Sequence, residues 1–215
     1  MSKQKEFEYD TRKIGKLYPI IKPFTMAFVH FMYKVRFVGR ENIPTDSGFI
    51  LASNHLSTLD PVFLIAACPQ KLYFMGKKEL FQKPFQRWFF TGMNSFPVNR
   101  AGADTKAIDF AESLLRDGNV LGIFPEGTRS KTYSPQRARG GVALIARATG
   151  ADIVPVSIYF SGKPHWRSRL TVRFGTVIPN AELNLPEGER DTAGLRAAAN
   201  GIMERIVALW EQGHA

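Results

Sequence analysis

A histidine and a carboxylate lie five positions apart in the segment Asn54-His55-Leu56-Ser57-Thr58-Leu59-Asp60. The segment directly follows an apolar run, residues 49–52, which is typical of a buried strand. A neutral imidazole that is held by a carboxylate can act as a general base toward a weakly acidic hydroxyl. The pattern predicts that Asp60 accepts a hydrogen bond from Nδ1 of His55 and leaves Nε2 free to take a proton.

A simpler interpretation of this pair needs no chemistry. Pro61 disfavours helical geometry at the residue before it and is well suited to the first position of a helix. We therefore expect Asp60 to cap a helix that starts at Pro61, with residues 55–59 forming a turn that can fold His55 back onto the carboxylate. Taken alone, the pair fits a helix cap beside an ordinary turn histidine more readily than it fits an active site.

A second polar segment, Phe124-Pro125-Glu126-Gly127-Thr128-Arg129-Ser130, follows another expected strand. Gly127 permits a close approach of the backbone to a ligand, and an arginine can hold a phosphate through two parallel hydrogen bonds. Glu126 is expected either to orient Arg129 or to bind a substrate hydroxyl. A third strand end, residues 96–100, carries Arg100. Because ligands bind outside the carboxyl ends of strands in α/β sheets, we expect His55, Arg100 and Arg129 to share one crevice.

The chain beyond residue 35 alternates between strand and helix patterns. This alternation predicts an α/β domain with a largely parallel central sheet flanked by helices. The expected strands are 35–38, 48–53, 71–75, 95–98, 120–124, 153–160 and 170–177, and the expected helices are 61–68, 81–93, 104–116, 139–149 and 191–212.

The N-terminal part has a different character. Residues 12–34 carry large apolar side chains at mostly helical spacing, with Pro19 and Pro23 expected to break or kink the helix. Basic residues flank the segment, as in helices that lie in a lipid interface, although packing on the chain's own domain explains the pattern equally well. These basic residues are Lys13, Lys16, Lys22, Lys34, Arg36 and Arg40. We accordingly divide the chain into a membrane-associating helical segment, 1–34, and an α/β domain, 35–215.

The composition limits the classes of protein to which the chain can belong. The net charge is +10, and residues 1–40 contribute +6 of it, which favours anionic partners such as lipid head groups or nucleic acid. The single cysteine, Cys68, excludes an internal disulfide framework and fits a reducing compartment. We see neither a secretory signal nor an uncharged run of the ~20 residues that a membrane-spanning helix needs.

The four ordered segments Asn54–Asp60, Phe96–Arg100, Phe124–Ser130 and Ile153–Val156 resemble the conserved blocks of the glycerophospholipid acyltransferases. The closest resemblance is to the 1-acylglycerol-3-phosphate (lysophosphatidic acid) acyltransferases. It implies transfer of a fatty acyl group from an acyl carrier protein or coenzyme A thioester to a lysophospholipid hydroxyl, without a cofactor or metal. It also implies a peripheral enzyme at the cytoplasmic face of the cell membrane.

The resemblance assigns roles residue by residue. His55 matches the family's catalytic base and Asp60 the carboxylate that orients it. The acceptor-binding positions correspond to Arg100, Glu126, Gly127, Thr128 and Arg129, with the two arginines best suited to phosphate. Two features depart from the pattern, namely Pro97 within the second block and the basic residues Arg137 and Arg139 before Gly140. These departures leave the identity of the acceptor open, with glycerol 3-phosphate or another lysolipid as the alternatives.

Two features of the sequence bear on other classes of function, namely its charge and the motifs that it lacks. The charge suggests a nucleic-acid-binding or membrane-binding protein without catalysis, but no RNA-recognition signature is present. A hydrolase in which His55 activates water is a further alternative. The chain has no P-loop, no His-Glu-x-x-His zinc motif and no Gly-x-Ser-x-Gly elbow, so neither nucleotide, zinc nor acyl-enzyme chemistry is indicated. The aromatic segment 81–93, with its basic flanks, is a second candidate surface for lipid or for the acyl donor, and ordinary core packing explains its aromatic residues about as well.

Overall fold

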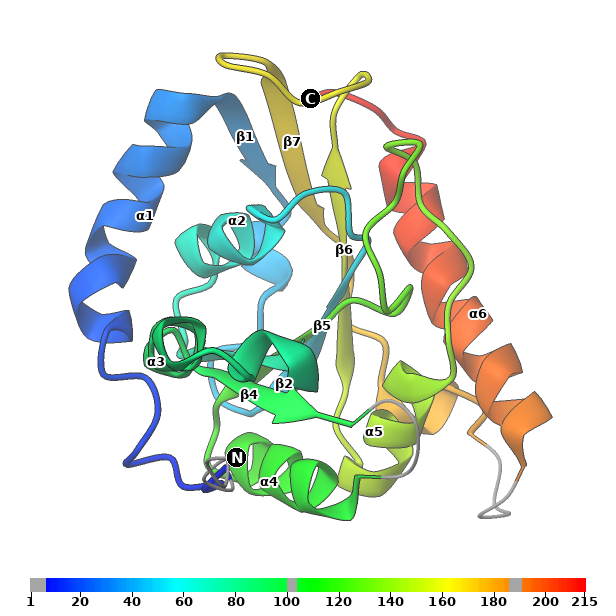
Figure 1. Ribbon diagram of the computed structural model, residues 1–215. Coiled ribbons are helices and arrows are strands. Elements are labelled where there is room, and N and C mark those ends of the chain that lie inside the picture. The colour runs from blue at the N-terminus through cyan, green and yellow to red at the C-terminus, as the bar shows by residue number, and fades with distance from the viewer. Residues whose placement is uncertain (1–6, 100–103, 186–190) are drawn as a thin grey trace.

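The computed structural model describes residues 7–99, 104–185 and 191–215 (Figure 1). Within them, the strands form one sheet in the order β1-β7-β6-β2-β5-β3-β4. Their bounds are Lys34–Val38 (β1), Phe49–Ser53 (β2), Leu72–Lys77 (β3), Ser95–Val98 (β4), Val120–Ile123 (β5), Ile153–Tyr159 (β6) and Arg169–Phe174 (β7). Neighbouring strands pair in parallel except β6 and β7, so the prediction of a largely parallel sheet is confirmed.

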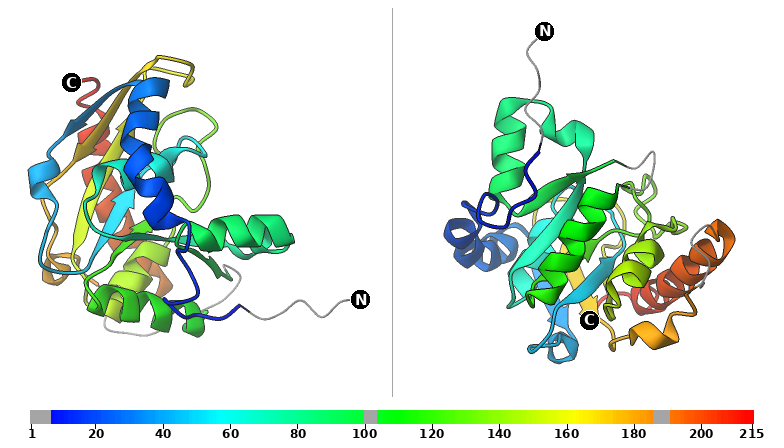
Figure 2. Two further views of the ribbon diagram at one scale, coloured as in Figure 1. Left: turned by 90° about the vertical axis from the view of Figure 1, so that its left-hand side faces the viewer. Right: turned by 90° about the horizontal axis from the view of Figure 1, so that it is seen from below.

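Helices cover both faces of the sheet (Figures 1 and 2). Successive residues of a strand point to opposite faces, and β2 shows this directly. Phe49 and Leu51 pack with α1 and α2, whereas Ile50 and Ala52 pack with α4, α5 and α6. The helices span Tyr18–Met32 (α1), Asp60–Ala67 (α2), Pro84–Gly92 (α3), Thr105–Arg116 (α4), Gly141–Thr149 (α5) and Thr192–Trp210 (α6).

The helix α1 is not broken by its prolines, and it packs on the domain while it leaves an apolar side exposed. It runs unbroken through both prolines. Pro19 lies in the first turn, where a missing N–H costs nothing, and Pro23 lies inside the helix, which continues past it. One of its sides, with Thr25 and Val29, is buried against the domain. Its other side leaves large apolar side chains exposed, so α1 packs on the domain and still offers an apolar surface.

Lys22 does not serve as a free basic flank. Its Nζ donates hydrogen bonds to the carbonyl oxygens of Pro69 and Gln70, just beyond the end of α2, at 2.6 and 2.8 Å. Partial burial lowers the pKa of this lysine. The side chain therefore ties α1 to α2, which removes it from the set of lysines expected to face lipid.

The segment after β3 also differs from expectation. The predicted helix over 81–93 is divided into a short 3₁₀ helix, Lys78–Phe81, and α3, which begins at Pro84. Proline fits the first turn of a helix, so Pro84 supplies a new start. Figure 2 shows α3 projecting from the body of the molecule beside the edge strand β4. Its aromatic side chains consequently have a partly exposed environment.

Candidate active site

The turn between β2 and α2 is held in place by Asn54. This buried amide accepts a hydrogen bond from the Ile158 N–H at 2.7 Å and donates one to the Ile158 carbonyl at 2.9 Å. It thereby continues the β2–β6 pairing beyond Ser53, where the backbone ladder ends. The start of the turn that carries His55 is thus fixed to the centre of the sheet.

His55 and Asp60 are in contact, as predicted. Nδ1 of His55 lies 2.7 Å from Oδ2 of Asp60, and the same oxygen accepts the backbone N–H groups of Leu56 and Ser57 at 2.6 and 2.8 Å. Asp60 is fully buried, whereas the His55 side chain keeps 18% of its surface exposed. Oδ1 of Asp60 has no hydrogen-bond partner among the described residues. The carboxylate thus orients the imidazole with Nε2 directed away from it.

The prediction that Asp60 caps the helix was wrong in detail. The helix α2 begins at Asp60 itself, and no side chain caps it. The carboxylate turns back toward the preceding turn instead, since that is where its three donors lie. The interpretation of Asp60 as a helix cap and nothing more is therefore excluded.

The face of the imidazole is also held. The ring of His55 stacks on Phe124 with centroids 4.0 Å apart, and Phe124 lies parallel to Phe74 at 6.1 Å. Gly122 makes room for this arrangement, because a Cβ at that position would come within 2.4 Å of the Phe74 ring. Three residues, Phe74 on β3, Gly122 on β5 and Phe124 just after β5, thus fix the plane of the imidazole.

The turn 124–130 grips the backbone of His55 from the other side. Oε1 of Glu126 accepts the His55 N–H at 3.0 Å, and the Ser130 N–H donates to the His55 carbonyl at 2.7 Å. Glu126 is 2% exposed. Burial raises the pKa of Glu126 to about 7; the N–H groups of His55 and Gln136 act in the opposite direction, and the charge of Asp60 adds to the rise.

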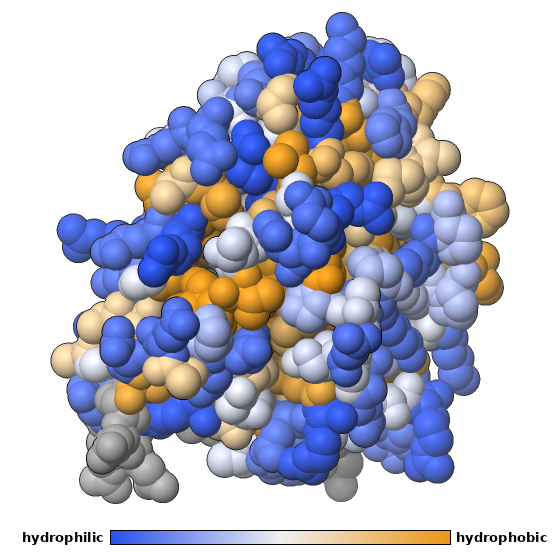
Figure 3. All heavy atoms as spheres, turned by 180° about the vertical axis from the view of Figure 1, so that it is seen from behind, coloured by the Kyte–Doolittle hydropathy of each residue, from blue (hydrophilic) through white to orange (hydrophobic). Residues whose placement is uncertain are grey.

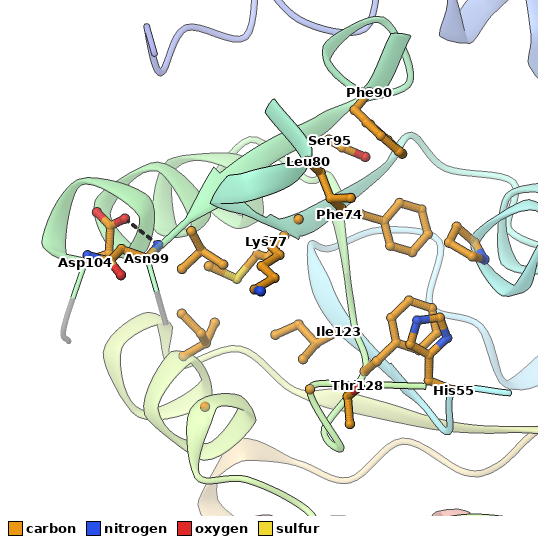
Figure 4. Close-up of a pocket in the computed structure, with 18 of the residues that line it drawn as sticks. His55, Phe74, Lys77, Leu80, Phe90, Ser95, Asn99, Asp104, Ile123 and Thr128 are labelled. Atoms are coloured by element: carbon orange, nitrogen blue, oxygen red, sulfur yellow. Dashed lines mark hydrogen bonds between the residues drawn. The ribbon is translucent and has the colours of Figure 1, made fainter. Parts of the chain in front are cut away.

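A cavity of about 650 Å³ opens beside His55. Figure 4 shows His55 and Thr128 at one end of it and Asn99 and Asp104 at the other. Side chains from β3, the 3₁₀ helix Lys78–Phe81, α3, β4, α4, β5 and α5 line the space between, and most of them are apolar: Phe74, Met75, Leu80, Phe89, Phe90, Val98, Ile108, Ile123, Leu144 and Ile145. A concave, mostly apolar site with a few polar groups at its ends is typical of a small-molecule pocket.

The predicted site residues divide into three groups. Gly127, Thr128 and the exposed Arg129 line the cavity together with His55, so the expectation that His55 and Arg129 share one crevice is confirmed. Arg100 lies outside the described residues. Glu126 is absent from the cavity lining, and its carboxylate meets the His55 turn instead of the space where an acceptor would lie.

Three contributors to the site were not identified from sequence. Asn54 and Ser130 were recognised only as members of their segments, and the stacking partner Phe124 only as a strand end. Each acts through a contact between segments about 70 to 100 residues apart. For Asn54, the sequence did offer a signal, namely a polar residue placed directly at the end of an apolar strand.

The chain is similar in sequence to known acyltransferases. Residues 34–159 match the family model described as Acyltransferase. The chain is 33% identical over 180 residues to a 1-acyl-sn-glycerol-3-phosphate acyltransferase of Bacillus subtilis, covering 81% of this chain and 87% of that relative. It is 35% identical over 134 residues to the enzyme of the same name from Borreliella burgdorferi, of which it spans about half (51%).

A solved structure is similar over most of the chain. The crystal structure of the 1-acyl-sn-glycerophosphate acyltransferase from Thermotoga maritima superposes with a TM-score of 0.65 at 26% sequence identity. The similarity covers 88% of this chain and 78% of that one.

Proposed function

This chain belongs to the acyltransferase family, and from that premise we propose that it transfers a fatty acyl group from an acyl thioester to the free hydroxyl of 1-acylglycerol 3-phosphate, forming phosphatidic acid. The observation that carries the proposal is the contact between Nδ1 of His55 and the buried Asp60, beside a cavity that Arg129 also lines. A base next to a cationic group suits an acceptor that bears both a hydroxyl and a phosphate.

The proposed reaction has two steps. Nε2 of His55 takes the proton of the acceptor hydroxyl while that oxygen attacks the thioester carbonyl. The tetrahedral intermediate then expels the thiolate, and the imidazolium returns the proton to give the free thiol. Asp60 stabilises the positive charge on the imidazole throughout. No acyl-enzyme is required, since the thiolate is already a good leaving group.

The two ends of the cavity suit different parts of the substrates. The exposed Arg129 at the end near His55 is placed to hold the acceptor phosphate, a role for which Arg100 is a second candidate. The apolar lining toward α3 and α4 suits an acyl chain. The donor is a thioester of acyl carrier protein or of coenzyme A, and the basic residues near α3, including Lys83 and Arg87, suit the acidic groups of either.

We further propose that the protein works on an anionic membrane surface. Ile20, Phe24, Phe28 and Phe31 form an exposed apolar stripe along α1, here called the α1 stripe; Phe24 is 67% and Phe31 64% exposed. Trp166, from the β6–β7 connection, extends the stripe by packing edge-on against Phe31 at 4.7 Å. Seen from behind, hydrophobic side chains are visible along the edge of the molecule where α1 lies (Figure 3).

Amphipathic helices with exposed aromatic residues bind at the boundary between head groups and acyl chains. Among the described helices, none is both long and apolar enough to cross a bilayer. The α1 stripe therefore supports attachment to one surface. The acceptor, itself a membrane lipid, would then be reached without leaving that surface.

The test offers the purified protein one labelled acyl thioester with lysophosphatidate, glycerol 3-phosphate, a zwitterionic lysolipid or no acceptor. We expect phosphatidic acid to form with lysophosphatidate, at least ten times faster than thioester is lost without an acceptor. Equal thioester loss with and without acceptor would identify a hydrolase, and preference for another acceptor would reassign the substrate. Running the panel with acyl carrier protein and coenzyme A thioesters separately assigns the donor.

A further inference from the structure

We propose that Glu126 is a positioning residue that fixes the backbone of the catalytic histidine, and that it does not bind the acceptor. The inference rests on the proposed function, since it assigns Glu126 a role in the same reaction. The carboxylate of Glu126 accepts the His55 N–H at 3.0 Å through Oε1. The other oxygen of this carboxylate, Oε2, is buried and has no hydrogen-bond partner among the described residues.

The position of Glu126 rules out ready contact with a substrate. Its side chain is almost completely buried, and it does not line the cavity, although the next three residues all do. The segment 124–130 therefore has two sides. Glu126 and Ser130 hold the His55 backbone, whereas Gly127, Thr128 and Arg129 face the cavity; Phe124 does both, since it stacks on the His55 ring and lines the cavity.

The contacts on His55 together leave its ring little freedom. In the backbone of His55, the N–H donates to Glu126 and the carbonyl oxygen accepts from the Ser130 N–H. The imidazole ring contacts Asp60 through Nδ1 and Phe124 through its face. Nε2 is left for the substrate. Displacement of a catalytic group by about 1 Å can cost ~10²-fold in rate. Loss of the bond that fixes the His55 N–H should therefore lower kcat even though no contact with substrate is lost.

A matched pair of substitutions separates this role from acceptor binding. Glu126→Gln keeps an oxygen that can accept the His55 N–H, and Glu126→Met fills nearly the same volume without an acceptor atom. We expect Glu126→Gln to keep kcat within about threefold and Glu126→Met to lose about 10²-fold. The KM for lysophosphatidate should stay within about twofold in both variants. Glu204→Gln, an exposed carboxylate on α6, serves as the control.

Amide exchange gives a readout that is independent of activity. The chain has four histidines, so selective ¹⁵N-histidine labelling yields four backbone signals in the full-length protein. The His55 amide should exchange slowly in wild type and Glu126→Gln and at least tenfold faster in Glu126→Met, while the amide of His30, in the last turn of α1, is unchanged. These signals distinguish failure of this inference from failure of the proposed reaction.

Three results would overturn the inference. The first is a tenfold rise in the KM for lysophosphatidate in Glu126→Gln with kcat retained, which would place Glu126 on the acceptor. The second is full activity of Glu126→Met. The third is a His55 amide that exchanges equally fast in wild type and Glu126→Met. If Glu126→Met does not fold, Glu126→Gln alone tests the inference. It should then keep kcat and the KM for lysophosphatidate near the wild-type values and show slow exchange of the His55 amide.

Discussion

Replacing Asp60 by asparagine tests whether the buried carboxylate works through His55. The change removes the charge that faces the imidazole at 2.7 Å and keeps an oxygen for the Leu56 and Ser57 N–H groups. Two opposite unit charges about 4 Å apart attract by about 4 kcal/mol at an effective dielectric constant of about 20. The imidazolium that forms in the transition state loses this attraction, so we expect kcat to fall by about 10³-fold.

The assay is a double-mutant cycle on labelled acyl transfer to lysophosphatidate. If Asp60 acts only through the imidazole, then adding Asp60→Asn to His55→Ala should slow the reaction by no more than about threefold beyond His55→Ala alone. Asp191→Asn is the matched control, since Asp191 also accepts a backbone N–H, from Gly194, at the exposed start of α6. Losses that multiply in the double variant, or an Asp60→Asn enzyme with more than about a third of wild-type activity, would refute the reasoning.

Three further changes have definite expected outcomes. In wild type, burial raises the pKa of Glu126 to about 7, so the unfolded chain releases the Glu126 proton at a lower pH than the folded protein does. The free energy of unfolding of wild type should therefore fall by at most about 3 kcal/mol as pH rises from about 4.5 to 7. Glu126→Gln should abolish this fall, which urea unfolding at pH 5 and 8 measures. Arg129→Ala should raise the KM for lysophosphatidate about tenfold or more with little change in kcat, and an unchanged KM, as in the exposed control Arg205→Ala, would remove its phosphate role. Phe24→Ser with Phe31→Ser should reduce binding to anionic vesicles at least tenfold, and undiminished sedimentation with vesicles would refute the α1 stripe as a lipid surface.

Much of the sheet could be predicted because its central strands, such as β2 and β5, are continuous apolar runs bounded by turn residues. The five strands β2 to β6 point the same way, so the polar segments after β2 and β5 had to meet at one edge. The contact between His55 and Asp60 followed from the short turn between strand and helix. These features depend on local patterns and on a general rule of topology.

The sequence did not reveal which way individual side chains point. Glu126 and Arg129 lie three residues apart in one turn, yet one is buried against the His55 peptide and the other faces the cavity. Lys22 appeared to be one of several basic flanks, but its partners are the carbonyl oxygens of Pro69 and Gln70 just beyond α2, which are almost 50 residues away. Such assignments depend on contacts between distant segments, which residue spacing does not encode.

The central claim is that the imidazole of His55 is the base that activates a phosphorylated lipid hydroxyl. The most direct measurement is the rate of phosphatidic acid formation from lysophosphatidate and a labelled acyl thioester, compared between wild type and His55→Ala at matched folding, as judged by Tm. The account predicts a loss of about 10²–10⁴-fold in the variant. Equal turnover by the two proteins would contradict it.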